Sequence, residues 1–224
     1  MYALPGQTVD DLDRDLETAL ALKPPHLSIY HLTIEPNTVF AKFPPQVPAD
    51  DDAYAMLDRI TERTAQVGLG RYEVSAYARE GHRCWHNTNY WQFGDYLGLG
   101  AGAHSKLSFA HRVCRMVRHR EPGLYIQKAM AGSAVAQSNE VSRSELPFEF
   151  MLNALRLKDG VPANAFSERT GLPVSAIDKE LQIAQDRGLL SNDLGLIKPT
   201  DKGFDFLSDL QSFFLPKNDG SRAG

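Results

Sequence analysis

The chain has 224 residues, of which 42% are hydrophobic and 23% charged, with a formal net charge of -4. This length allows one large domain or two small ones, and the composition is typical of a soluble globular protein. The charge balance argues against a nucleic-acid partner, and the chain has neither a basic leader nor an apolar run of about 18 residues. Two cysteines cannot form a disulfide framework, so we expect a cytoplasmic protein without a membrane span.

The first block, residues 1–48, has the pattern strand, helix, strand. Residues 2–5 end a strand, and Thr8 with Asp11 three positions later forms an N-cap pair for a helix that closes before Pro24. Alternating apolar residues at 27–34 predict the next strand. The block is therefore expected to be a parallel βαβ unit, and because two parallel strands do not make a sheet buried on both faces, we interpret it as the tail of a larger barrel.

The second block, residues 49–141, is predicted to combine one helix with a β-rich segment. The helix covers 51–67 and ends at Gly68, and a strand follows at 72–77. The cluster HNTNYW (86–91), a glycine-rich stretch (94–105), alternating arginines and a short helix near 125–130 come next. Such a dense group of aromatic and amide side chains indicates either recognition or a plug for a corner of the core.

The third block, residues 142–215, is mostly helical, and residues 216–224 are expected to be a disordered tail. Helices are predicted at 146–157, 163–170, 175–187 and 203–214, with a hairpin at 188–200. This order matches a winged-helix-like domain. Because the predicted helix 175–187 carries three acids against two bases, we do not expect the domain to bind nucleic acid.

Charge and histidine concentrate between Arg79 and Arg120, where seven Lys or Arg residues stand against two acids, together with five of the seven histidines. A basic, histidine-rich and aromatic segment suits an anionic ligand with a flat or metal-bearing body. The alternative is a solvated pair of strands with alternating arginines. On charge alone, this alternative is favoured over a ligand site.

Two further motifs are weaker signals of a ligand site, and each has a simpler interpretation. Gly98, Gly100 and Gly102 match a loose dinucleotide fingerprint, but no helix start follows, so we expect them to allow close approach of the backbone instead. His82, Cys84 and His86 alternate and would share one face of an extended segment, yet a zinc site would need further ligands.

Several stretches together resemble the haem chaperone branch (HemW) of the radical SAM family, which is related to oxygen-independent coproporphyrinogen III oxidase. They are MYALPGQT at the start, LSIYHLTIEP (27–36), YEVS (72–75), HNTNYW, and GDYLGLGAGAHS (94–105). HNTNYW is the most specific of them. The resemblance implies an α/β fold, namely the C-terminal part of a radical SAM partial barrel followed by a mixed α+β segment and the winged-helix-like domain.

The chain departs from that family in lacking the CxxxCxxC motif and the glycine-rich strand end, which bind [4Fe-4S] and S-adenosylmethionine in full-length members. Cys84 and Cys114 cannot replace three clustered thiolates, so we expect no radical chemistry from this chain alone and interpret it as a truncated product or fragment. Whether it is an enzyme stays open. A porphyrinogen oxidase and a non-catalytic winged-helix interaction module remain the alternatives.

The resemblance implies a function centred on haem, which would pass to an unidentified acceptor protein. His86 is the candidate axial ligand of the haem iron, Tyr90 and Trp91 are candidate ring contacts, and Asn87 could orient His86. Nearby arginines could contact the propionates. Exposed barrel strands also make a dimer plausible.

Overall fold

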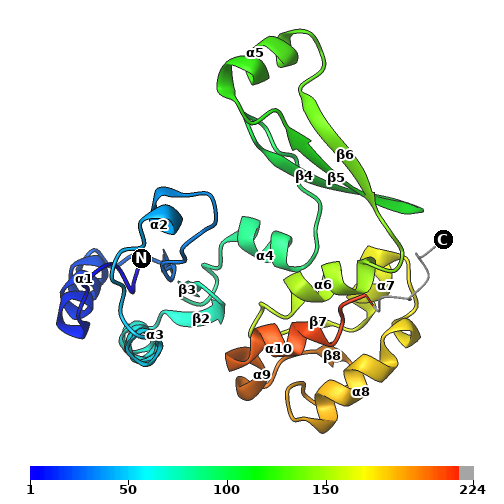
Figure 1. Ribbon diagram of the computed structural model, residues 1–224. Coiled ribbons are helices and arrows are strands. Elements are labelled where there is room, and N and C mark those ends of the chain that lie inside the picture. Colours follow the sequence, from blue (N-terminus) through cyan, green and yellow to red (C-terminus); the bar gives the residue numbers. More distant parts are fainter. Residues whose placement is uncertain (217–224) are drawn as a thin grey trace. The chain divides into compact units, whose positions relative to one another are not determined.

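The computed structural model describes residues 1–216 and divides the chain into two units, Met1–Trp85 and His86–Gly224 (Figure 1). The predicted tail lies outside the described residues apart from Pro216. Each unit is considered by itself. Within residues 1–216, every helix is too short or too polar to cross a bilayer.

The first unit packs two long helices beside a small antiparallel sheet. Its elements are α1 (Val9–Ala21), β1 (His26–Ser28), α2 (Val39–Lys42), α3 (Asp50–Gln66), β2 (Gly70–Glu73) and β3 (Ala76–Ala78). The sheet has the order β1-β3-β2. Leucines of α1 and Met56 and Ile60 of α3 are buried together, and Arg59 of α3 pairs with Asp13 of α1 at 2.8 Å.

The predicted helices of this unit are confirmed because their signals are local. Thr8 and Asp11 form the expected reciprocal capping box, with Thr8 Oγ1 accepting from Asp11 N. The helix predicted at 51–67 is α3, and Gly68 follows it with a φ of +79°. A capping side chain and a left-handed glycine act within one helical turn, so no distant partner is needed to place these ends.

The predicted strands of this unit are partly wrong. Of the stretch 27–34 only Leu27 and Ser28 belong to a strand, β1, which pairs antiparallel with β3. The stretch 72–77 is split between β2 and β3, which pair with each other. The parallel relation of the βαβ pattern appears at one bridge, between Tyr2 and His31, where Tyr2 N donates to Tyr30 O at 2.9 Å. Alternation at 72–77 thus concealed a tight turn between two strands.

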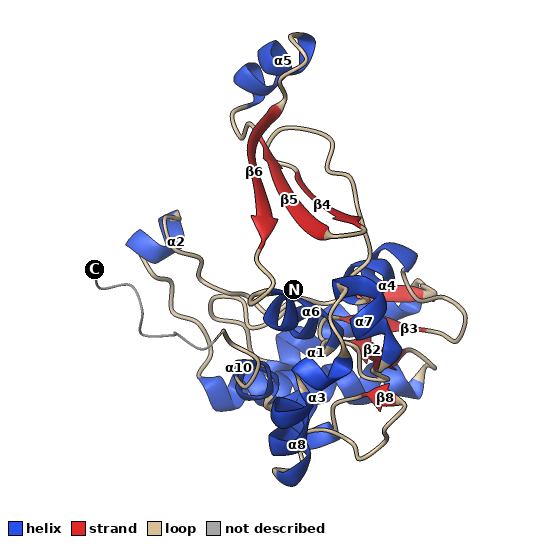
Figure 2. Ribbon diagram, turned by 90° about the vertical axis from the view of Figure 1, so that its right-hand side faces the viewer, coloured by secondary structure: helices blue, strands red, loops and turns tan. Residues whose placement is uncertain are grey.

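The second unit begins at His86, the second residue of α4, and builds a three-stranded antiparallel sheet in the order β4-β5-β6. Its first elements are α4 (Trp85–Trp91), β4 (His104–Phe109), β5 (Arg112–Arg118), α5 (Pro122–Met130) and β6 (Val135–Val141). The short helix predicted near 125–130 is α5. It lies at the end of the sheet away from α6 (Leu146–Ala154) in both views (Figure 1, Figure 2).

Short helices and a two-stranded sheet complete this unit. They are β7 (Val161–Pro162), α7 (Asn164–Thr170), the 3-10 turn η1 (Val174–Ala176), α8 (Asp178–Asp186), β8 (Leu196–Ile197), α9 (Asp201–Asp205) and α10 (Leu207–Ser212). Phe150 and Phe166 are fully buried and meet edge to face at 5.3 Å between ring centroids. The predicted helix 175–187 begins later, after η1, and the predicted helix 203–214 is broken at Phe206. The winged-helix assignment stays a prediction.

Two expectations about the middle of the chain are wrong. HNTNYW was placed in a β-rich segment but lies on helix α4. His82, Cys84 and His86 therefore do not share the face of a strand, because His82 and Cys84 lie in irregular structure and His86 lies on the helix. Mixed α and β structure with antiparallel sheets is nevertheless the class of fold that is observed.

Candidate functional site

The HNTNYW cluster occupies all but the first position of α4. His86 is exposed, and Tyr90 lies one turn further on with a ring centroid 6.5 Å from that of His86. Residues four apart lie on one side of a helix, so these two rings form a short stripe. Asn87, half-buried, has interactions of its own in the fold.

The second asparagine of the cluster closes the helix. Gly94 N donates to Asn89 O at 2.7 Å and Phe93 N to Tyr90 O at 3.1 Å, while the Asn89 side-chain amide donates to Asp95 O at 3.0 Å. This is a Schellman-type end, in which the left-handed residue is normally glycine. Here it is Phe93, with a φ of +57° and a side chain only 1% exposed. Burial of the ring offsets the local backbone strain, which costs about 1–2 kcal/mol.

A buried lysine holds this helix end to the sheet. Lys106 of β4 is 1% exposed, and its ammonium donates to Phe93 O at 2.9 Å, Asp95 Oδ1 at 3.0 Å and Ser108 Oγ at 2.9 Å. The same group lies 4.0 Å from the Phe93 ring centroid. Burial lowers the pKa of Lys106, although the bond with Asp95 opposes the shift. Since three acceptors surround the ammonium, Lys106 fixes the loop after α4 and is not available to a ligand.

Tyr90 and Trp91, the predicted ring contacts, are both packed against other groups. Tyr90 lies 4.9 Å from the Tyr96 ring and 4.9 Å from Trp91, which it meets edge-on. The Arg156 guanidinium lies 4.2 Å from the Trp91 ring. Among the described residues no acceptor reaches the buried Trp91 indole nitrogen. The two rings therefore anchor the end of α4 to Arg156, in the turn after α6, and to Tyr96, which forms a bridge with Lys106 of β4.

Tyr96 joins this packing to a charged pair. Arg115 of β5 donates to the Tyr96 hydroxyl at 3.1 Å and also pairs with Glu149 of α6. Burial, followed by the hydrogen bond with Tyr90, raises the pKa of Tyr96 to about 12. Tyr96 is thus a neutral structural group at physiological pH, and Arg115 is committed to the fold.

The opposite end of α4 is accessible. Trp85 is 79% exposed and directly precedes the exposed His86. The sequence interpretation missed Trp85 because it lies one residue outside the motif, although an aromatic residue next to a candidate ligand is itself a signal. Because each side chain is open to solvent, either one can contact a ligand without rearrangement of the core.

Gly98 and Gly102 approach the chain's own backbone, and Gly100 contacts a side chain. A Cβ on Gly98 would lie 2.1 Å from His104 O, and Gly98 O accepts from Arg118 Nε at 3.0 Å. Gly100, with a φ of +114°, donates its N–H to the Tyr125 hydroxyl at 3.1 Å, and Gly102 donates to His119 O at 2.8 Å. The glycine loop is therefore built to lie against the sheet and α5.

Several members of the basic window are used inside the fold. Lys106, Arg115 and Arg118 bond to carbonyl, hydroxyl or carboxylate oxygens, whereas Arg112 and Arg120 are exposed. Across residues 1–216 no three His, Cys, Asp or Glu side chains gather as a metal centre would require. An axial bond from one histidine to iron needs no such group.

This chain resembles known proteins along most of its length. The HemN C-terminal domain matches residues 141–206. Proteins named heme chaperone HemW from Haemophilus influenzae and Escherichia coli are each 38% identical to this chain over 216 residues, or 96% of it. The chain is thus similar to HemW proteins over nearly all of its own length. It spans about half the length of these HemW relatives, 55% and 56% respectively.

A solved structure supports the fold of this chain. Coproporphyrinogen III oxidase (HemN) from Escherichia coli, described as a radical SAM enzyme, superposes with a TM-score of 0.73 over 95% of this chain and 53% of its own. The two are 18% identical, so the match shows the fold alone. The predicted resemblance to the C-terminal part of that architecture is confirmed.

Proposed function

We propose that this chain handles haem as cargo and that α4 carries the iron contact through His86. The observation that supports it is an exposed imidazole on a helix anchored at its other end, in a chain 38% identical to proteins named heme chaperones. Neutral imidazole is a common axial ligand of haem iron, and exposure allows ligation without unfolding.

The neighbouring side chains fit this role in different ways. Trp85 offers an exposed indole surface to a porphyrin, while the packing of Tyr90 and Trp91 favours a supporting role over direct stacking. Direct ring contacts by Tyr90 and Trp91, and orientation of His86 by Asn87, stay predictions. The haem would pass to an acceptor protein in the cytoplasm.

Titration of the purified chain with hemin tests the proposal. We expect a Soret band characteristic of histidine ligation, and we expect His86→Ala to weaken binding by about tenfold or more, because loss of one good ligand bond costs at least about 1.4 kcal/mol. His111→Ala is the matched control, since His111 is also exposed and lies in the same basic window. Equal binding and identical spectra for wild type and His86→Ala would remove His86 from the role.

A further inference from the structure

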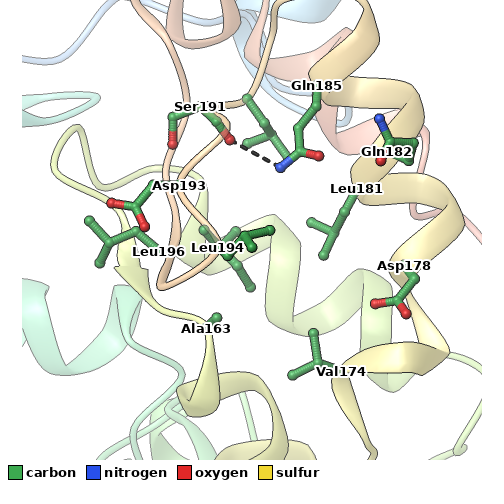
Figure 3. A pocket seen from close by; sticks show the side chains of 12 residues that line it. Ala163, Val174, Asp178, Leu181, Gln182, Gln185, Ser191, Asp193, Leu194 and Leu196 are labelled. Atoms are coloured by element: carbon green, nitrogen blue, oxygen red, sulfur yellow. Dashed lines mark hydrogen bonds between the residues drawn. The ribbon is translucent and has the colours of Figure 1, made fainter.

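A cavity of about 340 Å³ lies between α8 and a hairpin closed by the bridge of Leu190 with Pro199 (Figure 3). We name it the α8 groove. Leu181 of α8 and Leu194 of the hairpin point toward one another across it, and Val174 contributes from η1. The volume is within the range of sites that take a ligand group, and apolar and polar side chains share its lining.

Leu194 is the most exposed large apolar side chain of the described chain, at 91%. It sits at the tip of the hairpin, which is braced from α8 by the Gln185 amide donating to Ser191 O at 3.1 Å (Figure 3). The hairpin therefore presents an apolar residue to solvent on a supported backbone. Covering such a residue removes apolar surface from water without first opening the core.

The charged side chains that line the groove are all acidic. Asp178 on α8 and Asp193 on the hairpin belong to its lining, and among the lining residues, all of which are described, none is basic. Gln182 and Gln185 add uncharged amides. Carboxylates of this kind repel phosphate backbones and attract Lys or Arg.

We propose that the α8 groove docks a segment of a partner protein that presents a large apolar side chain next to a lysine or arginine. The apolar side chain occupies the space between Leu181 and Leu194, and the cation faces the carboxylate of Asp178 or Asp193. This interaction uses no residue of α4, so it stands independently of haem binding.

Selection of random peptides displayed on phage against the full chain tests the proposal. We expect enrichment of sequences with Leu, Ile, Met or Phe adjacent to Lys or Arg, and the best peptide, labelled with fluorescein, should bind with an affinity measurable by anisotropy. Leu194→Asp should weaken that binding by about tenfold or more, since interface energy concentrates in a few central residues. Asp178→Asn combined with Asp193→Asn should weaken it less and reduce its dependence on salt.

Leu99→Asp is the matched control, because Leu99 is an 81% exposed leucine in a loop outside the groove. It should bind the peptide as the wild type does, and circular dichroism should show that all variants stay folded. The proposal is overturned if no basic and apolar motif is enriched, if Leu194→Asp binds unchanged, or if duplex DNA binds and competes with the selected peptide.

Discussion

The two ends of α4 differ although they belong to one short motif. At its start, Trp85 is 79% exposed and His86 is open to solvent. At its end, Tyr90 and Trp91 are wedged among Tyr96 and Arg156, and the helix stops at Phe93, which is buried beside Phe150 and Lys106. Density of aromatic residues in a sequence therefore does not by itself distinguish recognition from packing.

The two ends of α4 therefore have different roles. A ligand that binds at the exposed end needs a helix that does not move, and the packed end supplies that rigidity through Lys106 and the Phe93 turn. Preorganisation of this kind lowers the entropic cost of binding. Substitutions at the two ends should consequently separate stability from ligand binding.

The largest expected contrast is between Phe93→Ala and Trp85→Ala. Loss of the buried Phe93 ring should lower the free energy of unfolding by about 3–5 kcal/mol. Trp85→Ala should change it by no more than about 0.5 kcal/mol, because the side chain is mostly solvated. Urea denaturation followed by circular dichroism measures both, and equal losses would contradict the division between the two ends.

Removal of the buried lysine should have the next largest effect. Lys106→Met leaves Phe93 O and the carboxylate of Asp95 without their shared donor, and we expect the free energy of unfolding to fall by about 2–3 kcal/mol. Lys128→Met, at an exposed position of α5, is the control and should be nearly neutral. A Lys106→Met protein as stable as the wild type would show that the ammonium does not hold the turn.

A smaller effect is expected at the Trp91 ring. Arg156→Leu removes the guanidinium 4.2 Å from that ring and should cost about 1 kcal/mol. In a Trp85→Phe background Trp91 is the remaining tryptophan, so its emission maximum reports the change directly. Unchanged emission and stability would place Trp91 outside this contact.

The smallest effect concerns pH. Burial opposes ionisation of Asp95, but hydrogen bonds from Ser108 and Lys106 outweigh it and hold the pKa of Asp95 below its ordinary value of 3.8. A lowered folded-state pKa contributes stability that is present above 3.8 and is lost as the pH falls through the folded-state value. The free energy of unfolding of Asp95→Asn should therefore decline less than that of the wild type between about pH 5 and about pH 3. Parallel declines would contradict this account.

Local signals allowed much of the helical structure to be predicted. Thr8 with Asp11, and Gly171 after α7 with a φ of +69°, mark helix ends through contacts within a single turn. The resemblance to HemW proteins was likewise recognisable from motifs spread along the chain, and the comparisons confirm it.

The packing around the site could not be predicted because it depends on residues distant in sequence. Burial of Lys106 requires Phe93 and Asp95 from the loop after α4, and the role of Trp91 requires Arg156 from the turn after α6. The sequence alone suggests that Lys106 and Arg115 are cations available to a ligand. In the structure Lys106 is bonded to Asp95 and Arg115 to Tyr96.

The most direct test of the central claim is rescue of the His86→Ala complex with hemin by added imidazole. The account predicts that His86→Ala loses the histidine-ligated Soret and visible bands of the wild type and that free imidazole restores them, since the exposed end of α4 leaves room for a replacement ligand. A His86→Ala spectrum that already matches the wild type before imidazole is added would contradict the assignment of iron ligation to this end of the helix.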